Sequence, residues 1–151
     1  MKMIQLIYAS TLSGDVSFSE INRIQTLAQR KNHQFNISGL LVYGRRYFLQ
    51  CIEGPVKDIN QLYSNIEKDS RHRDLKLLET REVTSRSFEN WSMHLIMLTE
   101  QMDHLILKYC NSPHFEPHKI SSKNALGLLK ELNENYSTQH QITLSENHKV
   151  D

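Results

Sequence analysis

The chain has 151 residues, 38% of them hydrophobic, so it is long enough to bury one core, and its polar remainder predicts a solvated portion as well. Its 18 basic and 17 acidic residues are interspersed and give a formal net charge of +1, which argues against a nucleic-acid partner or an anionic membrane surface. No signal peptide opens the chain, and no apolar run approaches the roughly 20 residues that span a bilayer. Its two cysteines favour reduced thiols over a disulfide framework. We therefore expect a cytoplasmic protein.

The chain opens with a mostly apolar run at residues 3–10, which is typical of a central strand. Alternation places Tyr8 beside aliphatic side chains, so its hydroxyl needs a partner unless the tip of the side chain reaches the surface. Ser17 and Glu20 form a capping box, which predicts that a helix begins there and ends near Asn32. Taken alone, that asparagine is explained by a helix cap.

The next segment predicts a hairpin. Two apolar runs, residues 40–43 and 47–52, flank residues 44–46, and the glycine at 44 is expected to take the unusual backbone angles of the turn. Gln50 is the anomaly, because alternation places its amide among side chains that normally form a core. A buried amide without partners costs roughly 1–3 kcal/mol. Either the strand is an edge strand that turns Gln50 to water, or backbone groups satisfy the amide, or a ligand does.

The remaining elements complete a domain. A second amphipathic helix is expected at residues 56–68, followed by a charged turn at 69–74 and a strand at 75–83. A last strand at residues 91–98 carries the only tryptophan and a methionine on one face, which alone indicates core packing. This order predicts an α+β fold over residues 3–98, a ferredoxin-like two-layer sandwich (βαββαββ) with both helices on one sheet face.

The chain changes character after that strand. Apolar residues at helical spacing predict two C-terminal helices within residues 99–136, and their stripes must cover the other sheet face or another subunit. His114 and His118 are possible metal ligands, but the intervening prolines prevent a regular helix and no third ligand is evident, so no metal site is predicted. Residues 137–151 are polar and without periodicity, which predicts a flexible tail.

Several of these segments together resemble the BLUF family, blue-light sensors that use flavin. The resemblance covers about residues 3–98 and the part after residue 100 resembles the two-helix extension of the short, stand-alone members. The segments that carry it are Leu6-Ile-Tyr-Ala-Ser10, Asn32 with Asn36-Ile-Ser-Gly-Leu-Leu-Val-Tyr43, Phe48-Leu-Gln-Cys-Ile-Glu-Gly54, Asp69-Ser-Arg-His72 and Phe88-Glu-Asn-Trp-Ser-Met93. A photoreceptor rather than an enzyme is implied.

The resemblance also implies a cofactor site and a mechanism. FAD, or else FMN or riboflavin, is expected to bind non-covalently between the two helices of the domain. Light-driven electron and proton transfer from Tyr8 is expected to precede a rearrangement of the Gln50 amide, whose two ends have opposite hydrogen-bonding roles. The implied photoactive residues are Tyr8, Gln50, Trp91 and Met93, of which the last two relay the change toward the C-terminal helices. The implied cofactor-binding residues are Ile24, Lys31, Asn32, Gln50, Ile66, Asp69 and His72.

Two other functions use the same sandwich. An acylphosphatase-like hydrolase needs a phosphate-binding loop with an arginine after the first strand, but residues 11–15 contain none and add an acid. An RNA-binding module would stack bases on the aromatic residues at 43–48 beside Arg45 and Arg46, but its signature is absent. Only the flavoprotein would purify yellow. Its signal is expected to leave through an unidentified downstream protein or a change of assembly, with a homo-oligomer expected.

Overall fold

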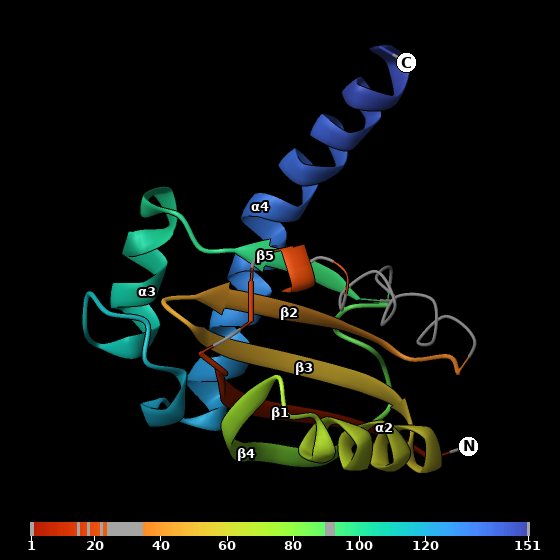
Figure 1. The fold of residues 1–151 in the computed structure, drawn as a ribbon. Coiled ribbons are helices and arrows are strands. Elements are labelled where there is room, and N and C mark those ends of the chain that lie inside the picture. The colour runs from red at the N-terminus through yellow and green to blue at the C-terminus, as the bar shows by residue number, and fades with distance from the viewer. Residues whose placement is uncertain are drawn as a thin grey trace.

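The computed structural model describes residues 2–14, 16–17, 19–21, 23, 35–89 and 93–150, with side chains up to residue 136. A five-stranded sheet in the order β4-β1-β3-β2-β5 forms its centre (Figure 1). The strands are β1 (Met3–Leu12), β2 (Ser38–Gly44), β3 (Tyr47–Pro55), β4 (His72–Val83) and β5 (His94–Met97). Neighbouring strands are antiparallel except β2 and β5, which are parallel. The sheet of the expected ferredoxin-like α+β fold is confirmed.

Helices pack on both faces of this sheet. The helical segments are α2 (Val56–Lys68), η1 (Glu100–Met102), α3 (Asp103–Cys110), η2 (Pro117–Lys119) and α4 (Ser122–Val150). Helix α2 contacts β1 and β3, whereas α4 contacts β1, β2, β3 and β5 and also packs against α3. The C-terminal helices therefore cover the second face of the sheet, which was one of their two expected positions. None of the described helices combines the length and hydrophobicity needed to cross a bilayer.

Strand alternation divides the buried side chains into two clusters. On the α2 side, Tyr8 and Ile52 pack with Ile59 of the helix. On the other side, Leu49 packs with the leucines of α4, of which Leu128 is 0% exposed. Burying such a side chain fully contributes roughly 1.5–3 kcal/mol. The sheet is thus held from both faces, and the α2 face is the one that carries Gln50.

The β2–β3 turn corrects one prediction. The turn residues are Arg45 and Arg46, with φ angles of 51° and 73°, so the arginines take the left-handed conformations and no described glycine has a positive φ. A two-residue turn with both φ values positive matches the twist of its strands, which is why this type is favoured in hairpins. Gly44 instead ends β2, where an added Cβ would lie 2.6 Å from Leu98 Cδ1. Its absent side chain is required for packing, not for the turn.

Several predicted boundaries shift. Strand β4 begins at His72, and β5 covers only His94–Met97 within the predicted 91–98, of which 91–92 lie outside the described residues. Helix α4 continues to Val150, so residues 137–150, expected to be a flexible tail, are helical and extend away from the sheet (Figure 1). Helix propagation needs no apolar stripe once a first turn has formed, because each added residue contributes one hydrogen bond.

The predicted capping box is partly confirmed. The backbone N–H of Glu20 donates to Ser17 Oγ at 3.3 Å, and residues 19–21 are helical. Residues 22 and 24–32 of the predicted helix lie outside the described residues. Both cysteines are free thiols, Cys51 fully buried and Cys110 partly so.

Candidate functional site

A pocket lies on the α2 side of the sheet and combines apolar walls with a polar rim. Its walls come from the ends of β1, β2 and β3 and from α2, and its rim comes from the turn between α2 and β4. The lining residues are Leu12, Ile21, Leu41, Phe48, Ile66, Asp69, Arg71 and His72. Pockets for small organic ligands have this composition, since apolar side chains provide contact area and a few polar groups fix the orientation.

A buried chain of hydrogen bonds runs beside this pocket. The Tyr8 hydroxyl donates to Gln50 Oε1, and Gln50 Nε2 donates to Met93 Sδ at 3.2 Å. The three residues are 4%, 7% and 1% exposed. Tyr8 and Gln50 are opposite each other in the β1–β3 register, so neighbouring central strands bring them together. The edge-strand explanation of Gln50 is therefore wrong, because β3 lies inside the sheet and the amide bonds to other side chains.

The environment of Tyr8 keeps its hydroxyl protonated. Burial raises the pKa of Tyr8 well above its ordinary value of 10.0, and the nearby Tyr63 and Asp69 raise that pKa further. The Tyr8 ring also packs edge to face with Tyr63 and with His72, at centroid distances of 5.8 and 6.2 Å. Tyr8 is thus a neutral hydrogen-bond donor at physiological pH, with its ring held in place.

The Gln50 amide has hydrogen-bonding capacity to spare. A glutamine amide donates twice from nitrogen and accepts twice at oxygen, and the described bonds use one donor and one acceptor. The acceptor in one of them, the Met93 sulfur, is weak. If the amide turned over, nitrogen would face Tyr8, whose hydroxyl also accepts hydrogen bonds. The Tyr8 hydroxyl can therefore bond either end of the Gln50 amide, whereas only the orientation described gives the Met93 sulfur a donor.

His72 ties the rim of the pocket to the sheet. Its Nε2 lies 2.6 Å from the Ile66 carbonyl oxygen, which only accepts, so Nε2 carries the proton. The other ring nitrogen, Nδ1, lies 2.9 Å from Ser10 Oγ and accepts from that hydroxyl when the ring is neutral. His72 thus bridges β1 and the end of α2 at the first residue of β4.

An ion pair forms the outer part of the rim. Arg71 Nε donates to Asp69 Oδ1 at 2.8 Å, and the Arg71 backbone N–H donates to the same oxygen at 3.0 Å. The hydrogen bond from the Arg71 side chain is the main cause that lowers the pKa of Asp69, against the opposing effect of burial. The rim therefore offers a negative and a positive group of balanced charge to a ligand.

Glu53, which the sequence analysis did not select, fixes the segment that positions Met93. This carboxylate is 0% exposed and accepts from Gln5 Nε2 at 2.9 Å and from the backbone N–H groups of Ser87 and Phe88 at 2.9 and 2.6 Å. It therefore holds the β4–β5 connection against β1 and β3. The sequence did contain a signal that could have identified Glu53, namely an acidic residue within a mostly apolar strand.

The absence of a side chain at Gly39 serves the same arrangement. A Cβ on Gly39 would lie 2.1 Å from the Cys51 carbonyl oxygen and 3.1 Å from Met93 Cε. Any other residue there would push β2 away from β3 or displace the Met93 side chain. The close approach of Met93 to Gln50 thus depends on a glycine in the neighbouring strand.

The structure brings together most of the predicted site residues that it describes. Ile66, Asp69 and His72 line the pocket, and Tyr8, Gln50 and Met93 form the buried chain on the same face. Ile24, Lys31, Asn32 and Trp91 lie outside the described residues. Sequence reasoning missed Leu41 and Phe48 as lining residues, although alternation with Gln50 would have found both.

The fold and the pocket define an α+β domain built to hold a small ligand beside a buried tyrosine–glutamine pair. The family model described as "Sensors of blue-light using FAD" (BLUF) matches residues 3–94. The chain therefore belongs to the BLUF family, whose domain is a flavin-binding blue-light sensor and not a catalytic domain. The residues present fit a flavin, because Ile66 and its apolar neighbours suit the faces of a flat ring system and the rim suits its polar edge.

Relatives carry the same domain in longer proteins. The "Blue light- and temperature-regulated antirepressor BluF" of Escherichia coli (strain K12) is 30% identical over 93 residues, which are 62% of this chain and 23% of that protein. A "Photoactivated adenylate cyclase subunit beta" of Euglena longa is 32% identical over 98 residues, 64% of this chain and 11% of that protein. The chain thus spans less than a quarter of these curated relatives.

A solved structure of similar extent also matches. The chain titled "BlsA photo-activated state" superposes with a TM-score of 0.79 at 29% identity, covering 86% of this chain and 94% of that one. The chain titled "BlsA ground state" gives the same TM-score. Because 86% is a larger share than residues 3–94 make up, the likeness extends into the C-terminal helices.

Proposed function

We propose that this chain senses blue light through a hydrogen-bond rearrangement of Tyr8, Gln50 and a non-covalently bound flavin, and passes the change on as altered binding to another protein. The buried Tyr8–Gln50–Met93 chain carries the proposal, since it places an under-satisfied amide beside the pocket. When bound, the flavin would supply blue-light absorption and an electron acceptor. FAD is the proposed form, with FMN and riboflavin as alternatives.

The proposed binding residues divide by chemistry. Ile66, together with Ile24, would cover the ring faces, and Asp69 and His72 would lie near the polar rim. Asn32 and Gln50 would meet the polar edge of the ring, and Lys31 would pair with a phosphate of the cofactor's tail. The support in the described residues is the pocket that Ile66, Asp69 and His72 line together.

The Gln50 amide is the proposed switch. In the orientation described, its oxygen accepts from Tyr8 and its nitrogen meets the weak Met93 acceptor. In the other orientation, its nitrogen would donate to Tyr8, and its oxygen would turn away from that hydroxyl. The second orientation gives up the bond to Met93 Sδ, so the proposal requires light absorption and the bound flavin to stabilise it.

The proposed output leads through β5 to the C-terminal helices. Met93 immediately precedes β5, which pairs with β2, and the next residue after the strand, Leu98, donates its backbone N–H to Tyr43 O. A shift of Met93, in concert with Trp91, would therefore reach residues 99–136. The relative named an antirepressor supports a protein as the downstream partner, and a cytoplasmic homo-oligomer is part of the proposal.

The decisive experiment is the visible absorption spectrum of the purified protein in darkness, during blue illumination and through recovery. We expect a flavin spectrum that shifts to the red and then returns. A flavin spectrum without that shift would contradict the switch but keep the cofactor site. A protein that binds no flavin, even after reconstitution, would contradict both.

Two variants test the roles of the hydrogen-bonding pair. Gln50→Ala should retain flavin and lose the red shift, because the amide that rearranges is gone. Tyr8→Phe should block the normal photocycle, because the ring remains without its proton donor. Tyr63→Phe is the matched control, since Tyr63 packs against Tyr8 at 5.8 Å and its loss of a hydroxyl should leave the shift in place. An unchanged red shift in the Gln50 or Tyr8 variant would refute the role of that residue.

A further inference from the structure

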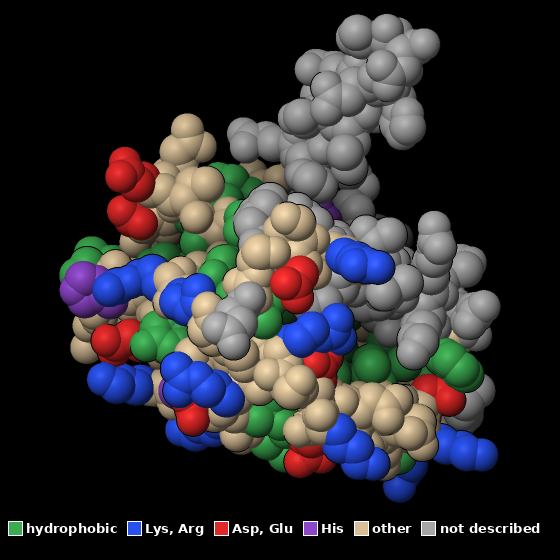
Figure 2. Space-filling view, in the orientation of Figure 1, with side chains coloured by type: hydrophobic (Ala, Val, Ile, Leu, Met, Phe, Trp, Pro, Cys, Tyr) green, Lys and Arg blue, Asp and Glu red, His purple; other side chains and the backbone are tan. Residues whose placement is uncertain are grey.

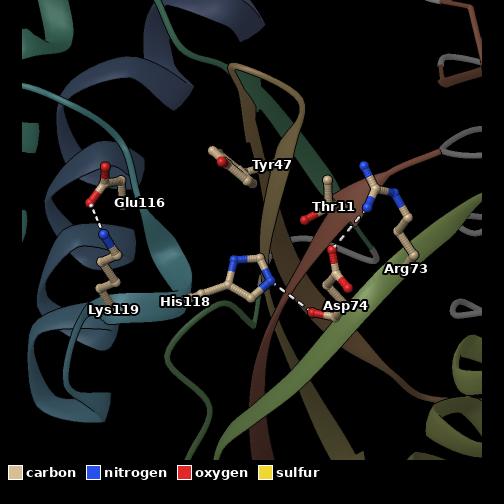
Figure 3. Close-up of a pocket in the computed structure, with 7 residues that line it drawn as sticks. All are labelled: Thr11, Tyr47, Arg73, Asp74, Glu116, His118 and Lys119. Carbon is tan, nitrogen blue, oxygen red and sulfur yellow. Dashed lines mark hydrogen bonds and ion pairs between the residues drawn. The ribbon is translucent and has the colours of Figure 1, made fainter. Parts of the chain in front are cut away.

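A second pocket lies on the α4 side of the sheet, where β1 ends and β4 begins. Segment η2, between α3 and α4, forms one of its walls, and the three strands β1, β3 and β4 form the others. The lining residues are Thr11, Tyr47, Arg73, Asp74, Glu116, His118 and Lys119 (Figure 3). The two pockets have no lining residue in common.

The two pockets lie back to back across one pair of strands. Leu12 and His72, which are register partners, line the pocket on the α2 side. Their neighbours Thr11 and Arg73, also partners, line the second pocket. Adjacent residues of a strand point to opposite faces, so a displacement of this strand pair changes both pockets at once.

Segment η2 is attached directly to the start of β4. His118 Nε2 lies 2.7 Å from the Asp74 carbonyl oxygen, and Lys76 Nζ donates to the His118 carbonyl oxygen at 2.8 Å. The His118 ring also packs against Tyr47 at a centroid distance of 5.7 Å. The wall of the second pocket therefore follows the strand that begins with His72. In this arrangement His118, considered above as a metal ligand, is a structural contact.

Two basic side chains, Arg73 and Lys119, line this second pocket. Arg45, Arg46 and Lys76 contact His114, Ser13 and His118 near it, and these five residues with the pocket are called the basic surface below. Figure 2 shows Lys and Arg side chains at the left of the molecule, where Figure 1 shows the β2–β3 hairpin tip and the start of β4, and further ones along its right and lower margins. Five basic residues here meet two acidic lining residues, although the whole chain has a formal net charge of only +1. The surface is therefore locally positive.

Three of these cations have only neutral partners among the described residues. Arg45 contacts His114 Nδ1, Arg46 donates to the Ser13 carbonyl oxygen at 2.7 Å, and Lys76 donates to that of His118. Arg73 and Lys119 form ion pairs of 3.2 Å with Asp74 and Glu116, and all four side chains are at least 38% exposed. Exposed pairs of this kind are weak, so an incoming carboxylate can replace them.

We propose that the basic surface is the docking site for an acidic segment of the downstream partner protein. The inference rests on the proposed function and identifies the chemistry of that partner. A peptide can place a carboxylate between Arg73 and Lys119 while its backbone contacts Tyr47 and Thr11.

The position of the surface couples it to the sensor pocket. The Tyr8 ring packs against His72 at a centroid distance of 6.2 Å, so a rearrangement at Tyr8 reaches the start of β4. Asp74 and Lys76 of that strand both hold η2 through His118. Illumination thus alters the shape of the basic surface and its affinity for the partner. By reciprocity, a bound acidic segment shifts the balance between the dark and illuminated states.

Binding of a fluorescent hexaglutamate peptide to the full chain tests the proposal. Anisotropy is measured in darkness and under continuous blue light, at low and at physiological ionic strength. We expect binding that weakens with salt and differs between dark and light. Arg45→Gln and Lys76→Gln should each weaken it roughly twofold to fivefold. Lys57→Gln and Lys68→Gln, exposed positions on α2, are the matched controls and should leave binding unchanged.

The outcomes separate this proposal from the photosensor itself, because the red shift is recorded in the same samples. No peptide binding by a protein that shifts normally would overturn the docking site and leave the sensor intact. Equal losses in the α2 controls, or tighter binding of a single-stranded RNA hexamer than of the peptide, would also overturn it. Equal affinity in darkness and light would overturn the coupling to the sensor pocket. Selective loss in the Arg45 and Lys76 variants, with normal red shifts, supports the site.

Discussion

Gln50 and Glu53 are buried polar side chains of the same strand, on opposite faces of the sheet, and their surroundings differ sharply. Both carboxylate oxygens of Glu53 have strong partners, because they accept from one side-chain amide and two backbone N–H groups. Gln50 has one strong partner, Tyr8, and one weak partner, the Met93 sulfur. A buried group with several strong partners fixes the chain around it, whereas an amide with one strong partner is less constrained. The contrast separates the scaffold of the site from the proposed switch.

The largest loss of unfolding free energy is expected when the Glu53 carboxylate is removed. Glu53→Ala leaves three donors without this acceptor, each costing roughly 1–3 kcal/mol, so we expect a loss of at least about 3 kcal/mol in unfolding free energy. Urea unfolding measures it. The matched control is Glu82→Ala, whose side chain is 62% exposed and 3.9 Å from Lys2, with an expected loss below about 1 kcal/mol.

The comparison would fail if both glutamate variants lost similar stability. Should Glu53→Ala not fold, Glu53→Gln provides a second measurement. Its amide oxygen still accepts, but its NH2 end faces donors, so an intermediate loss is expected. A Glu53→Gln protein as stable as the wild type would show that the carboxylate is not needed to hold the β4–β5 connection.

Alkaline pH isolates the stability that depends on the Tyr8 proton. The folded-state pKa of Tyr8 lies above the unfolded value of 10.0, so its contribution is complete below pH 10.0 and is lost as the pH rises beyond it. The unfolding free energy of the wild type, relative to Tyr8→Phe, should fall by up to about 1.4 kcal/mol per pH unit there. Parallel unfolding curves for the two proteins from pH 9 to 11 would contradict a buried, neutral Tyr8.

The smallest stability change is expected at the weak partner of the switch. Met93→Leu conserves volume and should cost less than about 1 kcal/mol in unfolding free energy. It removes the acceptor of Gln50 Nε2, so the rate of dark recovery should change while the protein stays folded. Met97→Leu, in β5, is the control and should recover at the wild-type rate. Identical recovery in the two variants would remove Met93 from the switch.

The sequence was sufficient to predict the architecture and to mark Gln50 as unusual, but not to predict the role of Glu53. Alternation over residues 3–10 and 47–52 fixes which side chains share a face, and it marks Gln50 as a polar group among apolar ones. The partner of the Gln50 amide, Tyr8, lies far away in the sequence, however, and the β1–β3 register determines which residue that partner is. Met93 and Glu53 gained their roles from the path of the β4–β5 connection, which no local pattern encodes.

Other differences have equally local causes. The helix at residues 137–150 was missed because it has no apolar periodicity, the main sequence signal for a helix. The second pocket was missed because it joins residues from β1, β3, β4 and η2. Its charged residues are spread along the sequence, so they form no basic or acidic run. The nearly neutral net charge, used against an RNA partner, also concealed a locally basic surface.

The two arginines of the β2–β3 turn set a limit on engineering this protein. Arg45 and Arg46 occupy left-handed conformations, which cost non-glycine residues roughly 1–2 kcal/mol each, and an Asn-Gly turn would relieve that strain. The same replacement would delete two of the five cations of the basic surface. At the proposed docking site, a variant stabilised in this way would therefore lose partner affinity while gaining heat resistance. Stability and the proposed signalling would then depend on the same two positions.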